Sequence, residues 1–196
     1  MKVVDDFLEF KDLSKLFDNL RPDDLENTGS YLQSKNLYQQ MEFLPLFICA
    51  IVPDNMYEGY IPKLNKKTNS SITNIQLSHQ IYKNDYPQSN YYSIVNEIFR
   101  PLLNVHSWLR IKINLIPCTE NIVEHGYHVD GSPLHPDQKT AIYYYNTNDG
   151  YTLFKDNGKK IKSVENRLIE FSGDKFHTGT TCTDQPFRVV LNMNYV

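Results

Sequence analysis

The spacing of apolar residues changes near residue 108, and this change constrains the fold more than any other feature of the sequence. From Leu109 to Leu115 apolar and polar side chains alternate, which is typical of a strand with one buried face. Short segments rich in β-branched and aromatic residues follow, separated by turn-forming residues. Eight strands are predicted in all: this one and seven more at 122–130, 140–146, 151–155, 159–163, 167–171, 176–179 and 187–195. Eight short, evenly spaced strands favour a jelly roll, also called a double-stranded β-helix.

The first hundred residues have the spacing of helices instead. Asp5 and Asp6 are candidate N-terminal caps for a helix that ends before Pro22. Its predicted apolar face consists of Phe7, Phe10, Leu13, Phe17 and Leu20. A second helix is predicted at 30–40, and a third at 91–103 with an apolar side formed by Ile94, Ile98 and Leu102. Residues 44–52 favour a buried strand, whereas residues 53–87 read as a long excursion that contains one strand.

The two halves together indicate an α+β fold, in which N-terminal helices pack against one sheet of a jelly-roll core. A length of 196 residues suits a single domain with a substantial core. We therefore expect residues 1–104 to be mainly helical support with one or two strands, and residues 105–196 to form the jelly roll that carries the chemistry. With 40% hydrophobic and 22% charged residues, the chain does not fit the disordered, collagen-like or coiled-coil classes.

Charge and cysteine content restrict the partners and the compartment. A net charge of -3 and the lack of a dense basic run disfavour nucleic acid as a partner. The longest apolar run, residues 43–53, is too short to span a bilayer, and the first residues do not resemble a signal peptide, so no membrane association is expected. Three widely separated cysteines, Cys49, Cys118 and Cys182, favour neither a disulfide framework nor a zinc site. A soluble protein of the reducing cytoplasm is predicted.

Two histidines and one aspartate form the most informative motif. His128 and Asp130 lie two residues apart on a predicted strand, so their side chains project from the same face. His177, on a distant predicted strand, can supply a third ligand. Two histidines with one carboxylate make the facial triad that is typical of non-heme Fe(II) oxygenases, which leaves metal positions open for oxygen and a chelating substrate.

An arginine and several other polar residues extend the predicted site. Arg188 follows the last of these histidines by eleven residues, and its planar guanidinium suits a carboxylate because it donates two charge-assisted hydrogen bonds. Asn114 and Asn192 either face the same cavity and contact the bound acid, or are solvated strand residues. Alternation alone also directs Trp108 and Arg110 toward the mouth of the site.

Other histidines fit the metal site less well. A second His-x-Asp motif occurs at His135 and Asp137, but Pro136 between them belongs in a turn, so this motif is expected to line the loop over the pocket. His125 is three residues from His128 and is expected on the opposite strand face, at the surface or behind the metal ligands.

These residues together resemble the Fe(II)/2-oxoglutarate-dependent dioxygenases, particularly the prolyl-hydroxylase-like branch and its small phage- and bacterium-encoded members. The resemblance covers about residues 109–195 and lies in four motifs: His128-x-Asp130, Ile142-Tyr143-Tyr144-Tyr145-Asn146, Asp149-Gly150-Tyr151-Thr152-Leu153-Phe154, and His177 followed by Arg188. The family commonly has two glycines before the Thr-x-Phe element, whereas Asp149 precedes Gly150 here. This departure concerns the geometry of one turn and leaves the metal site untouched.

The resemblance implies cofactors and a role for each residue. His128, Asp130 and His177 would bind Fe(II), Arg188 would anchor the distal carboxylate of 2-oxoglutarate, and Tyr144 would hydrogen-bond the same carboxylate. The reaction would consume O2 and 2-oxoglutarate, release succinate and CO2, and hydroxylate a C–H bond of the substrate. The expected substrate is a peptidyl side chain, such as a prolyl ring, or a small amino-acid-like molecule.

Two alternative functions remain open. The first is oxidative demethylation of nucleic-acid bases, although enzymes of that type usually carry an additional arginine downstream, and this chain has none after Arg188. The second is a non-enzymatic jelly-roll binding module that keeps a metal ion for structure. In either enzymatic reading, residues 53–87 are expected to contribute a lid, because loops on a rigid scaffold commonly set selectivity.

Overall fold

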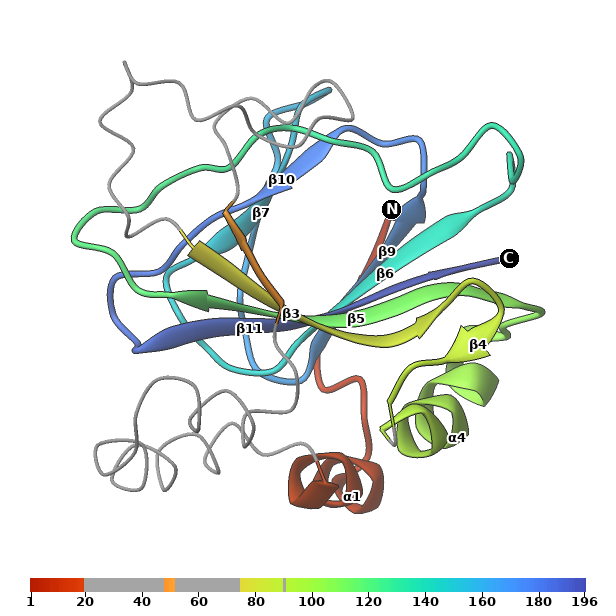
Figure 1. Ribbon diagram of the computed structural model, residues 1–196. Helices are drawn as coiled ribbons and strands as arrows, with labels where there is room; N and C mark the ends of the chain where they lie inside the picture. Colours follow the sequence, from red (N-terminus) through yellow and green to blue (C-terminus); the bar gives the residue numbers. More distant parts are fainter. Residues whose placement is uncertain (20–47, 52–74, 90) are drawn as a thin grey trace.

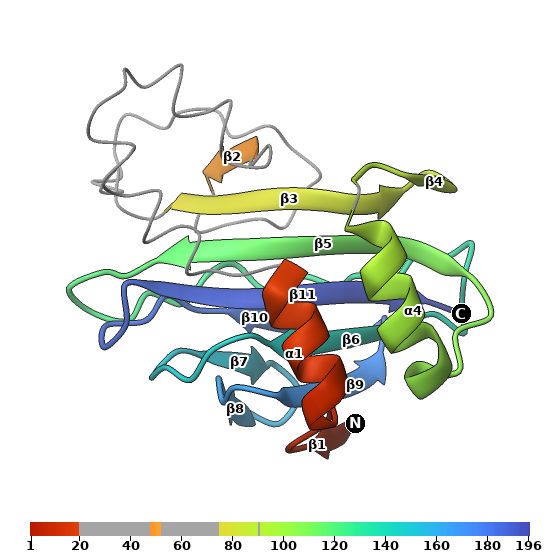
Figure 2. The ribbon, with the colours of Figure 1, turned by 90° about the horizontal axis from the view of Figure 1, so that it is seen from below.

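The computed structural model describes residues 1–19, 48–51, 75–89 and 91–196. Within them, two helices lie on one side of a large antiparallel sheet, and a three-stranded sheet faces its other side (Figure 1, Figure 2). The helices are α1 (Phe10–Asn19) and α4 (Tyr92–Leu103), and neither is long and apolar enough to cross a bilayer. The strands are β1 (Lys2–Val4), β2 (Ile48–Ile51), β3 (Ile75–Lys83), β4 (Tyr86–Pro87), β5 (Trp108–Pro117), β6 (Lys139–Tyr144), β7 (Tyr151–Phe154), β8 (Lys160–Lys162), β9 (Arg167–Ser172), β10 (His177–Gly179) and β11 (Phe187–Tyr195).

The large sheet places β11 near its centre. Its strand order is β1-β9-β6-β11-β5-β3-β2, with β4 paired to β3, and the small sheet has the order β10-β7-β8. The register sets Asn192 of β11 beside Lys112 of β5 on one side and Ile142 of β6 on the other. Residues directly opposite each other in adjacent strands point to the same face, so this register decides which side chains share the space between the sheets.

Two hydrophobic cores lie on opposite faces of the large sheet. The core on the helix side includes Phe99 of α4, Tyr143 of β6 and Leu191 of β11. The core between the two sheets includes Tyr144 and Val190. Since neighbours along a strand point to opposite faces, Tyr143 and Tyr144 enter different cores. The α+β class and the jelly-roll core predicted from the sequence are thereby confirmed.

Seven of the eight predicted strands are present as β5 to β11. The strand predicted at 122–130 is wrong, because this segment makes only isolated bridges, Glu124 with Thr180 and His128 with His177. It runs beside β10, but the two bridges are four residues apart on this segment and three residues apart on the β10 side, so no single register continues between them. Strand β1, which the pattern did not reveal, pairs with β9.

The helix predicted from Phe7 to Leu20 is α1, and part of its apolar face was assigned wrongly. Leu16 is buried, but Phe10 is 84% exposed. The place beside the start of the helix is filled by Leu8, which precedes it and is buried. Asn166 fixes this position, because its Oδ1 accepts a hydrogen bond from the Leu8 backbone N–H and its Nδ2 donates to the Leu8 carbonyl, at 2.9 and 3.0 Å. The side chains of Phe17 and Leu20 lie outside the described residues.

The helix predicted at 91–103 is α4, with its buried side shifted relative to the prediction. Ile98 is buried as expected, but Leu102 is 46% exposed, and Leu103 is buried in its place. Phe99 sets the rotation of the helix, because its ring packs edge-on against Tyr143 with the centroids 5.3 Å apart.

The remaining N-terminal predictions are only partly covered by the structure. The strand predicted at 44–52 appears as β2, paired with β3. The helix at 30–40 and residues 53–74 lie outside the described residues. Residues 75–87 form β3 and β4, and the turn between these strands contains Asn84 and Asp85, both with positive φ angles, 54° and 58°. The lid expected within 53–87 stays a prediction.

Candidate metal centre

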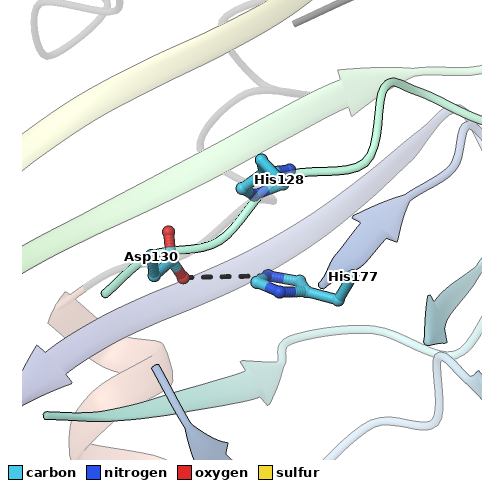
Figure 3. A group of neighbouring side chains, drawn as sticks. All are labelled: His128, Asp130 and His177. Carbon is cyan, nitrogen blue, oxygen red and sulfur yellow. Dashed lines mark ion pairs between the residues drawn. The ribbon is translucent and has the colours of Figure 1, made fainter. Parts of the chain in front are cut away.

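Three side chains from two distant parts of the chain meet inside the jelly roll. His128 and Asp130 lie on the segment that joins β5 to β6, and His177 begins β10 (Figure 3). One ligand atom from each residue lies within 4.8 Å of the other two. The His177 Nε2 atom is 3.7 Å from Asp130 Oδ2, and the side chains of these two residues are only 3% and 4% exposed. The side chains of Asp130 and His177 are therefore buried, whereas His128 is only partly buried.

The main chain brings the two histidines together. The backbone N–H of His128 donates to the His177 carbonyl at 2.9 Å, and the N–H of His177 donates to the His128 carbonyl at 3.0 Å. This reciprocal pair sets the two imidazoles side by side, with ring centroids 4.5 Å apart. Asp130 lies two residues after His128 on an extended segment, so its side chain projects in the same direction as that of His128. The three side chains are thus brought together by the isolated antiparallel bridge between His128 and His177, and not by a continuous strand ladder.

Both imidazoles are oriented to offer Nε2 to a metal ion. His177 Nδ1 lies 2.9 Å from the Lys175 carbonyl, and His128 Nδ1 lies 3.3 Å from the Gly126 carbonyl. When Nδ1–H donates to a carbonyl, Nε2 keeps its lone pair for a ligand bond. Burial lowers the pKa of His128, and the neighbouring His177 lowers it further. The neutral ring, which is the metal-binding form, is therefore favoured.

Asp130 is held by side chains from three strands. Arg110 of β5 donates from Nη2 to Oδ1 at 2.6 Å, while Asn192 of β11 and Thr140 of β6 donate to Oδ2 at 3.2 and 3.3 Å. Burial acts to raise the pKa of Asp130, but Arg110 first and then the two histidines outweigh it, so the pKa lies well below its usual range. Asp130 is thus a charged carboxylate in a fixed orientation.

Arg188 is a fully buried cation whose hydrogen-bond partners among the described residues are neutral. Its Nε donates to Ser163 Oγ at 2.8 Å and its Nη2 to Thr152 Oγ1 at 3.3 Å. The guanidinium carbon is 5.7 Å from the centre of the Tyr144 ring, and the Tyr144 hydroxyl donates to Thr152 Oγ1 at 2.8 Å. Burial lowers the pKa of Arg188, and Tyr144 partly offsets this effect. Among the described residues no carboxylate pairs with Arg188, so this position is suited to an anionic ligand.

The turn at Asp149 and Gly150 is held by the side chain of Asp149. Asp149 Oδ1 accepts a hydrogen bond from the Thr183 backbone N–H at 2.8 Å, so a side chain at this position is useful. Gly150 is the position where a side chain does not fit: an added Cβ would lie 2.6 Å from the Thr181 carbonyl oxygen and 2.7 Å from Arg188 Cδ. The glycine that the turn requires is therefore the one that packs against Arg188.

The other predicted residues are distributed unevenly around the centre. Asn192 contacts Asp130, whereas Asn114 is buried and accepts a hydrogen bond from Ser78 of β3 at 2.7 Å. His125 is buried and not at the surface, and burial first, then Arg188 and His128, lower its pKa to about 4.

The expectation that Trp108 reaches the mouth of the site is wrong. Its ring belongs to the helix-side core, where Nε1 donates to Asn96 Oδ1 at 2.9 Å. The cause is a register shift: Arg110 pairs with Asn194, but Trp108 pairs with Tyr195. This irregularity reverses the face to which the start of β5 points, which strict alternation cannot anticipate.

Two cations, Arg110 and Lys112, lie next to the metal ligands, and the sequence pattern did not identify Lys112 as part of the site. Both lie on β5 and share the interior face with Asn114. Burial, followed by repulsion from Arg110, lowers the pKa of Lys112 to about 8. The alternation of β5 would have identified Lys112. Its relation to Asp130 could not be foreseen, because that depends on the path of residues 118–138.

A pocket of about 290 Å³ opens beside Asp130. Arg110 and Asn194 form its inner wall, and Asn84 and Asp85 of the β3–β4 turn form part of its rim. His135 also lines it, in agreement with the expectation that the second His-x-Asp motif lies over the pocket.

Comparisons with known proteins agree with this architecture. The sequence matches no protein-family profile and no curated protein sequence. Among solved structures, a prolyl hydroxylase from Trichoplax adhaerens in complex with a hypoxia inducible factor oxygen degradation domain peptide fragment is similar with a TM-score of 0.54 and 13% identity, over 99% of this chain and 82% of that one. A Pseudomonas putida prolyl-4-hydroxylase is similar with a TM-score of 0.52 and 12% identity, over 99% of this chain and 90% of that one. The chain thus has the fold of these prolyl hydroxylases.

Proposed function

We propose that this protein is an Fe(II)- and 2-oxoglutarate-dependent dioxygenase that hydroxylates a C–H bond of a peptidyl residue, such as proline, or of a small amino-acid-like molecule. The observation that carries the proposal is the combination of an open His-His-Asp cluster with a buried arginine that has no carboxylate partner among the described residues. Each feature alone has structural explanations. Together they match a metal ion and an acid that binds to it.

The donor set fits ferrous iron. Two imidazoles and one carboxylate converge, and three protein ligands leave further coordination positions for other ligands. A closed structural zinc site would need a fourth protein ligand, and the described residues bring only three together. Iron bound by His128, Asp130 and His177 would supply the activation of oxygen that the hydroxylation requires.

Arg188 and Tyr144 are suited to bind the distal carboxylate of 2-oxoglutarate. Arg188 and Asn192 lie on the same face of β11, four residues apart, which corresponds to roughly 13 Å along a strand. Because Asn192 contacts Asp130, this separation leaves room for a five-carbon diacid and an arginine side chain between the metal ligands and the anchor. Thr152 and Ser163 fix the guanidinium, so that its fork is oriented before the acid arrives.

The apolar core between the sheets would keep water from this acid. Phe154, Phe171 and Ile142 belong to it, and the Phe171 ring packs edge-on against His177 with the centroids 4.8 Å apart. A dry surrounding strengthens the ion pair between Arg188 and a carboxylate, and it protects reactive species from side reactions.

The test is anaerobic titration of the protein with Fe(II) and 2-oxoglutarate. Wild type should develop a weak visible charge-transfer band, and Arg188→Met should require at least tenfold more 2-oxoglutarate, because a charge-assisted hydrogen bond contributes about 1.5–3 kcal/mol. Arg100→Met, which removes an exposed arginine of α4, is the matched control and should titrate like wild type. No band with wild type, and no succinate with any peptide or amino acid in air, would refute the proposal.

A further inference from the structure

The space around the metal ligands contains more positive charge than the proposed iron and co-substrate require. We call this space, bounded by β5, β11 and the segment with His128 and Asp130, the metal chamber. The two charges of Fe(II) and the one of Arg188 are balanced by Asp130 and the two carboxylates of 2-oxoglutarate. Arg110, which donates to Asp130, and Lys112 then add two positive charges that no further acid among the metal ligands and the co-substrate balances. Two partly buried cations close to each other are unfavourable unless an anion joins them.

Lys112 makes no side-chain hydrogen bond and no close ion pair within the part of the chain that the structure describes, although Asp130 is near enough to attract its charge. Its neighbours across the sheet are Asn192 of β11 and Gln80 of β3. Gln80 Nε2 donates to the Tyr82 and Ile111 carbonyls, both at 2.8 Å, which fixes this side chain, and no hydrogen bond joins it to Lys112. The lowered pKa of Lys112, caused by burial and then by Arg110, agrees with an ammonium that lacks an acceptor. The side chain is partly exposed, so a ligand can reach it.

Asn192 provides an independent sign of a missing ligand. Its Nδ2 donates to Asp130 Oδ2 at 3.2 Å, which fixes the amide, because the opposite orientation would set an oxygen against the carboxylate. Its Oδ1 is buried and has no hydrogen-bond partner among the described residues. Since buried acceptors are nearly always satisfied, a donor is expected beside Lys112 on this face.

Arg110 connects the position of Lys112 and Asn192 with a pocket that is open to the solvent. Its Nε and Nη2 donate to Asn194 and Asp130, which fixes the guanidinium plane, and Nη1 makes no hydrogen bond to the described residues. The pocket that it lines has a volume of about 290 Å³, at the small end of the range for ligand sites. Its lining is mostly polar, with Asp85 at the rim. A compact molecule that carries both an acid and an amino group fits this lining better than an extended apolar side chain.

We propose that Arg110 and Lys112 bind a carboxylate of the substrate and that Asn192 Oδ1 accepts a hydrogen bond from its amino group. The substrate is then a free amino acid or a similar small amino acid derivative, and not an internal residue of a peptide, which has no carboxylate to offer. This inference rests on the proposed function and narrows its substrate class. It assigns 2-oxoglutarate to the Arg188 end of the chamber and the substrate to the Arg110 end.

The experiment compares free L-amino acids with their amides, in which the carboxylate is neutralised. Each is titrated calorimetrically, without oxygen, into protein that holds Fe(II) and 2-oxoglutarate, so that binding is measured apart from turnover. At least one amino acid should bind, and its amide should bind at least tenfold more weakly, because a charge-assisted contact is lost. The same amino acid should stimulate succinate release in air.

Variants of Lys112 locate the effect. Lys112→Met should weaken binding of that amino acid at least tenfold without changing the affinity for 2-oxoglutarate, and Lys112→Arg should restore most of it. Lys159→Met removes an exposed lysine of the β7–β8 hairpin and should bind like wild type. Equal binding of acid and amide, binding of no amino acid, or a loss confined to 2-oxoglutarate in Lys112→Met would overturn the inference. The visible band of the same samples reports on the proposed function separately, since its absence would refute that function as well.

Discussion

Asp130 shows how single side chains adjust the candidate site. Arg110 is the strongest of its partners, and its planar fork reaches Asn194 and Asp130 at the same time, at 2.9 and 2.6 Å. A lysine could not span both acceptors in one fixed geometry. The carboxylate is therefore charged and oriented in the metal-free protein, so that little rearrangement is needed when a cation binds.

Lys112 allows a prediction about stability and pH at the residue scale. Its pKa in the folded protein, about 8, lies below the ordinary value of 10.5, so the charged form destabilises the fold at pH 7. The penalty should fade as the pH rises from about 8 to about 10.5, because the folded protein releases the proton first. Metal-free Lys112→Met should be more stable than wild type by about 1 kcal/mol at pH 7, a modest value since the side chain is partly exposed.

Urea denaturation at pH 7 and pH 10 measures this difference, with Lys159→Met as the control for removal of an exposed lysine. A gap between Lys112→Met and wild type that is constant across this range would contradict the assignment of a strained ammonium to Lys112.

At the scale of elements, α4 is held to the large sheet by one face. Phe99 is its central contact, with Tyr143 at 5.3 Å and Phe7 at 6.1 Å between ring centroids. Phe99→Ala should destabilise the protein by about 3–5 kcal/mol, because it leaves a cavity that the sheet cannot fill. Phe10→Ala on α1 should change the stability by less than about 0.5 kcal/mol, since that ring is 84% exposed.

Thermal or chemical denaturation of these two variants tests the packing of the helices, and a similar loss of stability in both would show that the assigned faces are wrong. The affinity for 2-oxoglutarate gives a second readout. It should be unchanged in Phe10→Ala, because Arg188 and its partners lie on the opposite side of the sheet.

Strands were easier to predict than the orientation of helices and loops, for physical reasons visible in particular residues. Alternation along β11 placed Arg188 and Asn192 on the same face, because a period of two leaves only two choices, but whether Asn192 faces the cavity stayed open until the strands were assembled. The rotation of α4 was missed, since Leu102 and Leu103 are equally apolar and only the contact of Phe99 with Tyr143 decides between them. The path of 122–130 was missed because its bridges to β10 are tertiary contacts.

At the scale of the whole molecule, the jelly roll was predictable from the sequence, but the pairing of the N-terminal strand β1 with the sheet was not. The strand spacing of the second half indicates two facing sheets, whereas the pairing of β1 with β9 joins Lys2 to Glu170, far apart in the sequence. The residue types of the metal cluster were recognisable from the sequence. Their partners, Arg110 and Thr140, became evident only when the strands were assembled.

The stability of the whole molecule without one metal ligand distinguishes a catalytic metal ion from a structural one. His177→Ala should remain folded, because both hydrophobic cores are built from other residues, although the loss of its packing on Phe171 should cost about 1–3 kcal/mol. Circular dichroism melts of metal-free wild type and variant measure this difference. The variant should also fail to form the visible band with Fe(II) and 2-oxoglutarate.

A variant that is unfolded at room temperature, together with a wild type that melts when the metal is removed, would instead favour the non-enzymatic binding module. His135→Ala is a suitable control, since this histidine is exposed at the rim of the pocket and is not part of the metal cluster.

Alternate positions along one strand contribute to the two different faces of the large sheet. Tyr143 and Leu191 pack against the helices, while their immediate neighbours Tyr144 and Asn192 face the candidate metal site. Substitutions at the helix-side positions should therefore change thermal stability, whereas substitutions at the interior positions should change ligand selectivity. The two kinds of substitution would affect each other only through shifts of the backbone that they share.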